Sequence, residues 1–289
     1  MPKYNDTIYA LSTPPGKSAI AVIRVSGKDA VRALKEITPS KKIFTNKVNI
    51  LILKHKGLLI DEVVVFYYKA PKSFTGEDVA EINCHGGIAV IKKIFKTLEE
   101  LGLRHAEPGE FTKRALLNGK IDLVKTESIS DIINAETEKQ REIAIKNISG
   151  ELSQFTKKIN EKIALNLANV EALIDFSDED LPPSTLNKIK EQNKNIINEI
   201  KKELKNSELS KPIRDGVKIA IVGKPNTGKS SFINFISKKD VSIVTNIPGT
   251  TTDSITSSVE IKGVKFTFVD TAGLRKHKNK NQPPSSISF

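Results

Sequence analysis

The sequence predicts three regions of different fold class: an α+β domain, an α-helical domain, and part of an α/β domain. Short β-branched runs mix with helical stripes up to about residue 118, and long helical periods follow to about residue 215. A strand, a glycine-rich loop and a helix come next. We therefore set the domain boundaries at 1–118, 119–215 and 216–289. We expect the last domain to be truncated, with a non-native tail from about residue 276.

The composition is typical of a globular chain that is long enough for more than one core. Of its 289 residues 38% are hydrophobic and 28% charged, and no apolar run approaches the roughly 18 residues of a membrane helix. The N-terminus lacks the apolar segment of a secretory signal, and the single cysteine, Cys84, excludes an internal disulfide. We therefore expect a cytoplasmic protein that does not bind membranes. The net charge of +12 would suit a polyanionic partner, although lysines dispersed over solvated faces give the same excess.

The first region has the alternation of an α+β domain. Apolar, β-branched runs predict strands, and apolar residues at helical spacing predict helices. Two of the strands flank a Lys-His-Lys-Gly turn and should form a hairpin. We expect strands at 18–25, 48–53, 60–68 and 79–83, and helices at 28–37 and 88–101.

The second region predicts antiparallel helices. Apolar residues recur at helical spacing from Leu152 to Ile174 and again from Leu186 to Leu204. Gly150 separates the first of these helices from the one before it. The segment 207–216 has the composition of a linker to the third region.

A phosphate-binding loop is indicated at the start of the third region. Residues 223–230 satisfy the pattern G-x-x-x-x-G-K-[ST] between an apolar strand at 217–222 and a helical pattern. The glycines let backbone N–H groups turn toward a phosphate, and the helix N-terminus adds a positive dipole end. Lys229 would then contact the β and γ phosphates, and Ser230 would ligate Mg²⁺.

Two later features favour a GTPase over a general ATPase. A strand at 264–269 ends in Asp270, which can hold the Mg²⁺ shell, and Gly273 can sense the γ-phosphate through its amide. A threonine in the loop 248–253 can close onto Mg²⁺ when that phosphate is present. We assign GTP binding to Gly223, Asn226, Thr227, Gly228, Lys229, Ser230, Ser231, Thr245, Asn246, Ile247, Pro248, Gly249, Thr250, Thr251, Asp270, Thr271, Ala272 and Gly273.

The hydrolytic step has two readings at this point. Leu274 stands where many small GTPases place a water-orienting glutamine, and leucine cannot orient water. Asn226 offers an amide oxygen beside the phosphates, so a monovalent cation held there could neutralise charge in the transition state. The alternative is that Asn226 only caps its own loop.

Together with strings in the first region, these residues resemble the bacterial tRNA-modification GTPase family MnmE, also called TrmE. Each string in the first region is weak alone, but their order is highly specific. The resemblance runs to about residue 275 and is carried by residues 13–16, 23–27, 73–78, 85–87, 108–111, 117–123, 223–231, 243–245 and 249–251.

This resemblance implies a partial P-loop, Ras-like G domain and a potassium-dependent GTPase. Members work with a flavoprotein, MnmG, to install a carboxymethylaminomethyl-type group at C5 of the tRNA wobble uridine. They form homodimers, and heterotetramers with MnmG, and bind a 5-formyltetrahydrofolate-type folate in the first region. The implied folate contacts are Arg24, Glu81 and Lys120; the Mg²⁺ ligands are Ser230 and Thr251; and the K⁺ ligands are Asn226, Thr245, the Ile247 backbone and Thr250.

The third region departs from the family pattern. No N-K-x-D string follows Asp270, Thr252 stands where the family usually has arginine, and the segment 276–289 is basic and low in complexity. The family's catalytic glutamate is not found there, so we assign no catalytic residue and expect this chain by itself to be inactive. Two alternatives remain. A ribosome-assembly GTPase shares the GTPase motifs but not the first-region strings, and a non-catalytic folate- and protein-binding dimer would use only the first region.

Overall fold

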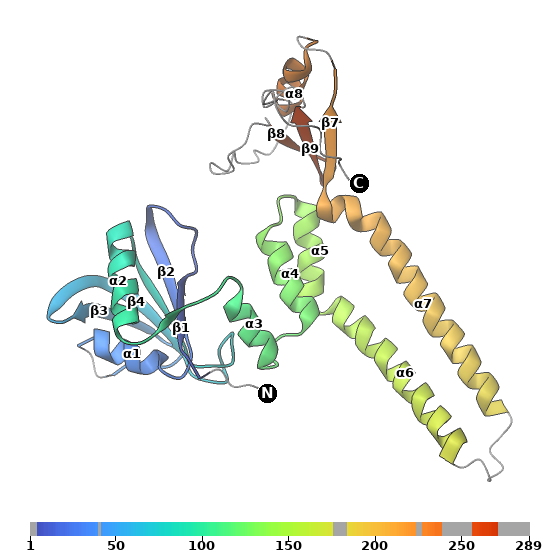
Figure 1. Cartoon of the computed structure of the whole chain (residues 1–289), viewed down its shortest axis with the longest axis horizontal. Helices are drawn as coiled ribbons and strands as arrows, with labels where there is room; N and C mark the ends of the chain where they lie inside the picture. Colours follow the sequence, from blue (N-terminus) through green and yellow to red (C-terminus); the bar gives the residue numbers. More distant parts are fainter. Residues whose placement is uncertain (1–4, 40–41, 176–183, 224–226, 239–255, 271–289) are drawn as a thin grey trace, which may run out of the picture. The chain divides into compact units, whose positions relative to one another are not determined.

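The first part of the chain is built on a largely antiparallel sheet. The computed structural model describes residues 5–39, 42–175, 184–223, 227–238 and 256–270, and divides into units Met1–Thr126 and Glu127–Phe289 (Figure 1). In the first unit the sheet order is β3-β4-β5-β2-β1-β6, with β1 and β6 parallel. The strands are β1 (Ile8–Leu11), β2 (Ser18–Ser26), β3 (Val48–His55), β4 (Leu58–Tyr68), β5 (Val79–Gly86) and β6 (Arg104–His105).

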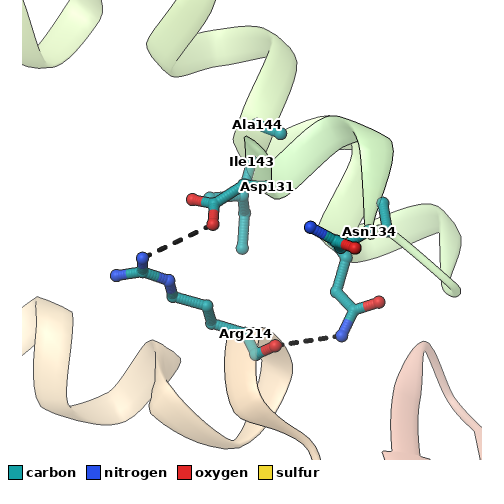
Figure 2. Close-up of a pocket in the computed structure, with 7 residues that line it drawn as sticks. Asp131, Asn134, Ile143, Ala144 and Arg214 are labelled. Atoms are coloured by element: carbon teal, nitrogen blue, oxygen red, sulfur yellow. Dashed lines mark hydrogen bonds and ion pairs between the residues drawn. The ribbon is translucent and has the colours of Figure 1, made fainter. Parts of the chain in front are cut away.

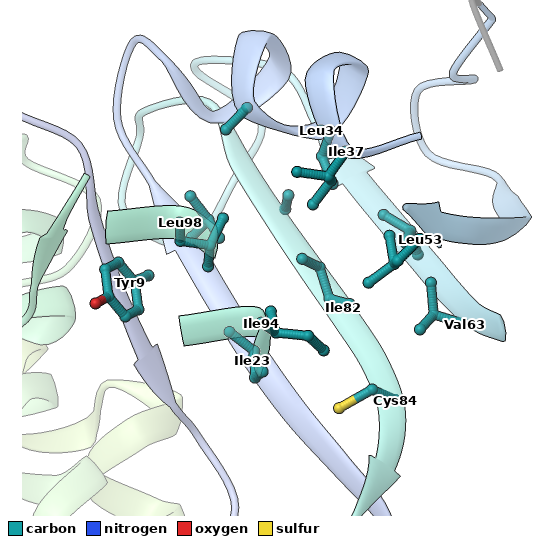
Figure 3. Packing of buried hydrophobic residues seen from close by; sticks show 14 of the residues in the cluster. Tyr9, Ile23, Leu34, Ile37, Leu53, Val63, Ile82, Cys84, Ile94 and Leu98 are labelled. Atoms are coloured by element: carbon teal, nitrogen blue, oxygen red, sulfur yellow. The ribbon is translucent and has the colours of Figure 1, made fainter. Parts of the chain in front are cut away.

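Two helices cover one face of this sheet and enclose the main core. They are α1 (Ala30–Ile37) and α2 (Ile88–Glu100), and α3 (Glu110–Leu117) follows β6. Side chains alternate between the two faces of a strand, so every second residue of the central strands points at these helices. The resulting cluster (Figure 3) includes Ile23, Val25, Leu34, Ile37, Leu53, Val63, Ile82, Cys84, Ile94 and Leu98.

The opposite face of the same sheet presents different side chains. The register of β2 and β5 places Arg24 opposite Glu81 and Ile20 opposite His85. Arg24 and Glu81 are half-buried, whereas Ile20 and His85 are exposed. Two of the three predicted folate contacts therefore lie on this second face.

The elements predicted for the first region are all confirmed, with ends that differ by at most three residues. The structure adds β1, β6 and α3, which hydrophobic periodicity did not indicate. Cys84 and His85 point to opposite faces of β5, since the thiol is in the core and the imidazole is exposed.

The helical region contains α4 (Leu123–Ile133), α5 (Glu138–Ser149), α6 (Glu151–Asp175) and α7 (Ser184–Asp215). Helix α5 begins with a capping box formed by Thr137 and Gln140 and ends at Gly150. Helices α6 and α7 are antiparallel: Lys162 binds Glu199, and Asn166 Nδ2 donates to Asn193 Oδ1 at 2.9 Å. Among the residues that the structure describes, no helix is long and apolar enough to cross a membrane.

The predicted linker at 207–216 is wrong, because α7 continues through Pro212 to Asp215. Proline removes one backbone hydrogen bond, which a helix tolerates near its end when other contacts hold the last turn. Here Gln140 Nε2 donates to the Arg214 carbonyl at 3.0 Å, and Arg214 pairs with Asp131. Helix α7 therefore leads almost directly into the next strand.

The third region contains a three-stranded sheet in the order β7-β9-β8. Strands β7 (Val217–Ile221) and β9 (Val264–Asp270) are parallel, β8 (Thr256–Ile261) is antiparallel to β9, and the helix is α8 (Lys229–Lys238). Val259 and Phe268 form a small core with Ile236 of α8. The predicted strand–loop–helix order of an α/β domain is confirmed, whereas the boundaries at 118 and 215 stay predictions.

Candidate functional site

The phosphate loop lies where the sequence predicts it, between β7 and α8. Gly228, which precedes α8, has φ +83°, a left-handed conformation that glycine adopts without strain. The Lys229 ammonium donates to the Gly223 carbonyl at 3.1 Å, and the lysine is only 9% exposed. The cation is thus held over the loop in the position where a phosphate would meet it. Ser230 and Ser231 follow in the first turn of α8.

Asp270 lies at the same edge of the sheet as this loop. Strand β9 runs parallel to β7, and Ile221 stands opposite Asp270. Parallel strands have their carboxyl ends at one edge, so the end of β9 is adjacent to the start of the loop. This is the placement that a carboxylate in a Mg²⁺ shell requires.

The other predicted nucleotide and metal contacts lie outside the described residues. The K⁺ set and the second Mg²⁺ ligand, Thr251, therefore stay predictions. The residues concerned are Asn226, Thr245, Asn246, Ile247, Pro248, Gly249, Thr250, Thr251, Thr271, Ala272 and Gly273.

Arg24 and Glu81, two of the predicted folate contacts, bind each other across β2 and β5. Arg24 Nε and Nη2 donate to Glu81 Oε1 at 2.9 and 2.6 Å. The two side chains are 27% and 23% exposed, so the pair is shielded but open to a ligand on one side. Glu81 Oε2 makes no printed contact in this pairing and can accept an N–H of a ligand.

Two aromatic rings flank the Arg24 guanidinium, and the sequence analysis did not single them out as site residues. The guanidinium carbon lies 5.5 Å from the Phe74 ring centre and 5.6 Å from that of Phe111, which is within cation–π range. Both phenylalanines belong to strings that carry the family resemblance, at 73–78 and 108–111. That membership was the available signal, but the sequence did not show that both rings meet Arg24.

Lys120, the third predicted folate contact, is attached to the loop that carries Phe74. Its ammonium donates to the Pro71 carbonyl at 2.9 Å. Its stem packs on Gly76, where an added Cβ would lie 3.1 Å from Lys120 Cγ and where φ is +78°. A carboxylate, two cations and two rings suit a flat, N–H-bearing ligand with an acidic tail, so these residues fit a folate.

A buried charge cluster holds this loop and α3 in place. Arg114 is fully buried and donates to Asp6 at 2.8 Å, to Glu110 at 2.9 Å and to Glu77 at 3.2 Å. Burial would raise the pKa of Glu110, but hydrogen bonds from Arg104, the Glu107 N–H and Arg114 outweigh it and lower the pKa to about 2. The cluster therefore stays ionised at neutral pH.

Ser26 connects the same cluster to the sheet. Its hydroxyl lies 2.7 Å from Glu77 Oε2 and 2.7 Å from Thr75 Oγ1. Because Ser26 ends β2, two residues after Arg24, the loop 73–77 is anchored directly beside the Arg24–Glu81 pair. The cluster thus sets the position of Phe74 from the loop and of Phe111 from α3.

A small cavity of about 80 Å³ lies between α4, α5 and the end of α7 (Figure 2). Asp131 and Arg214 meet across it at 3.4 Å, and Ile143 and Ala144 form its apolar wall. Its polar groups are used to fix the last turn of α7. We therefore interpret it as part of the joint between the helices and β7, rather than as a ligand site.

Comparison with known proteins agrees with this arrangement. The family model described as the GTP-binding protein TrmE N-terminus matches residues 7–120, and that of the MnmE helical domain matches residues 123–288. The first match covers the Arg24 site, and the second covers the helices and the phosphate loop.

Curated relatives include proteins named tRNA modification GTPase MnmE from several bacteria. Those of Aquifex aeolicus, Pelagibacter ubique and Fervidobacterium nodosum are 43%, 45% and 44% identical to this chain. The alignments cover 95%, 94% and 95% of this chain but only 62%, 62% and 61% of the relatives, so the chain spans about three fifths of their length. On these matches the chain belongs to the MnmE (TrmE) family.

Proposed function

We propose that these residues serve a GTP hydrolase that modifies tRNA, as the names of the relatives indicate. The observation that carries the proposal is the phosphate loop, with Lys229 over Gly223 and the end of β9 beside it. In this proposal Lys229 binds the β and γ phosphates, Ser230 ligates Mg²⁺, and Asp270 holds the water shell of that ion. The modification is a carboxymethylaminomethyl-type group at C5 of the wobble uridine.

The proposed hydrolysis depends on K⁺ rather than on a water-orienting side chain. Leu274 replaces the usual glutamine, so a cation near the phosphates must offset the charge of the transition state. We assign its ligands to Asn226, Thr245, the Ile247 backbone and Thr250, with Thr251 as the second Mg²⁺ ligand.

The Arg24 site is proposed to bind a 5-formyltetrahydrofolate-type folate. Glu81 would accept N–H groups of the pteridine, Arg24 would hold Glu81 in place between two aromatic rings, and Lys120 would attract an acidic tail. The further proposals are a homodimer, a heterotetramer with MnmG, and tRNA as the substrate in the cytoplasm. The net charge of +12 supports a polyanionic substrate.

A second candidate function is a non-catalytic folate- and protein-binding dimer. It is favoured by the contrast between the two units: the first has a large core of its own, whereas the described part of the third region has only a small one.

GTP hydrolysis measured in K⁺ and in Na⁺ at equal ionic strength distinguishes these candidates. We expect hydrolysis that is at least about tenfold faster in K⁺ and that Lys229→Ala abolishes, since hydrogen bonds to charged groups contribute about 1.5–3 kcal/mol. Lys218→Ala, an exposed lysine of β7, is the matched control. Equal rates in the two salts would refute the K⁺ assignment, and no hydrolysis in either would favour the non-catalytic dimer.

A further inference from the structure

We infer that His85, oriented by Asp61, is an additional contact for the ligand of the Arg24 site, accepting an N–H of a reduced folate through Nε2. The inference rests on the proposed folate binding and adds a residue to it. It starts from two side chains that neither the nucleotide site nor the Arg24–Glu81 pair uses.

Asp61 fixes the imidazole in one tautomer. Its Oδ1 lies 2.7 Å from His85 Nδ1, and its Oδ2 accepts the His85 backbone N–H at 2.8 Å. A carboxylate can only accept here, so Nδ1 carries the proton and the neutral ring presents Nε2 as an acceptor. The Asp61 side chain is only 10% exposed, whereas that of His85 is 72% exposed. A shielded carboxylate thus holds an imidazole that faces solvent.

The Asp61 bond to the His85 backbone has a structural explanation of its own. The paired register of β4 and β5 stops at Val64 and Asn83, and Asp61 Oδ2 takes up the next backbone N–H of β5. That explains one carboxylate oxygen. It does not explain why the other oxygen is used to orient an exposed ring.

The imidazole lines a groove on the same sheet face as Arg24. The groove has a volume of about 190 Å³, and its walls include Ala19, Ile20, Glu62, Val64, Asn83 and His85. It combines an apolar floor with acceptor groups, which is the usual character of a small-molecule site.

The spacing along β5 suits an extended ligand. His85 follows Glu81 by four residues on the same face, which is about 13 Å at the rise of a β-strand. A folate carries N–H donors both on its pteridine and at its glutamyl amide, so one molecule can present a donor at each end. Glu81 accepts at one end and His85 Nε2 at the other.

Calorimetric titration of this chain with 5-formyltetrahydrofolate tests the inference. One net hydrogen bond contributes about 0.5–1.5 kcal/mol, so His85→Ala should weaken binding by about fivefold. His85→Ala keeps the backbone bond to Asp61, and Asp61→Asn should weaken binding to a smaller extent by releasing the ring. His55→Ala, in the β3–β4 hairpin and bound to Glu100, is the matched control and should leave the affinity unchanged.

Nitrogen NMR of the unaltered chain gives a readout that does not depend on a variant. The His85 Nε2 resonance should shift toward that of a hydrogen-bonded nitrogen when the folate is added, and His55 should not respond. Binding that is lost in Arg24→Met but equal in His85→Ala and the unaltered chain, with a silent His85 resonance, would overturn the inference and leave folate binding intact. If the unaltered chain binds no folate, the proposed function of this site fails and the inference fails with it.

Discussion

Ile221 and Asp270 stand opposite each other at the ends of the parallel strands β7 and β9. This pairing places the end of one strand beside the start of the phosphate loop that follows the other. Two segments separated by about forty residues of sequence are thereby combined into one candidate site for a nucleotide and its metal ion.

Asp270→Asn should weaken nucleotide binding in the presence of Mg²⁺ by about tenfold, since groups that support a metal typically contribute 10–100-fold to its affinity. In EDTA the variant and the unaltered protein should bind alike, because the metal term is then absent from both. Glu260→Gln, on the neighbouring strand β8, is the control and should have no effect. A loss that persists in EDTA would show that Asp270 acts on the fold rather than on Mg²⁺.

Arg114→Met should destabilise the first unit by about 3–5 kcal/mol, because it leaves Asp6, Glu77 and Glu110 without their buried cation. Arg141→Met removes an exposed ion pair with Glu138 and should cost less than about 1 kcal/mol. All four tyrosines of the chain, and no tryptophan, lie in the first unit, so tyrosine fluorescence in urea reports on that unit alone. Similar unfolding midpoints for the two variants would contradict the role given to the cluster.

The stability of the first unit should fall as the pH is lowered from about 4.5 toward 2. The pKa of Glu110 is lowered to about 2 in the folded chain from a model value of 4.5, so the stabilisation is present above the unfolded pKa. It is lost as the pH falls through the folded value. Glu110→Gln should be less stable at neutral pH and should show a shallower decline in acid, as measured by urea midpoints. Parallel curves for the two proteins would assign the acid sensitivity to other carboxylates.

Cys84 should not react with thiol reagents while the first unit is folded. The cysteine is 2% exposed, and burial together with the Asp61 charge raises the pKa of its thiol to about 11. Labelling at pH 8 should therefore be at least about a hundredfold slower in buffer than in urea. Rapid labelling without denaturant would mean that this face of the core opens far more easily than its packing indicates.

The sequence was sufficient for elements whose signal is local. Strand β2 and helices α2 and α6 are defined by the spacing of their own apolar residues, and the phosphate loop is defined by eight consecutive positions. Strands β1 and β6 are too short for such a signal, and their pairing joins Ile8 to Arg104 across most of the first unit. The linker prediction failed because Pro212 outweighed the tertiary contacts of Arg214, which a sequence does not display.

The candidate site in the first unit divides in the same way. Arg24, Glu81 and Lys120 came from the family resemblance, and the structure brings the first two into contact. The roles of Phe74, Phe111 and Arg114 depend on which side chains meet after folding. A buried arginine that binds residues 37 and 108 positions away has no local pattern.

The central claim is that the phosphate loop of this protein drives tRNA modification, and the modified nucleosides of tRNA test it most directly. Cells of the source organism that lack the gene would be supplied with the unaltered protein, with Lys229→Ala or with Lys218→Ala, and their tRNA analysed by mass spectrometry. We predict that the C5-modified wobble uridine is restored by the unaltered protein and by Lys218→Ala, and that it is absent with Lys229→Ala. Full restoration by Lys229→Ala, or no change in wobble uridine when the gene is removed, would contradict the account.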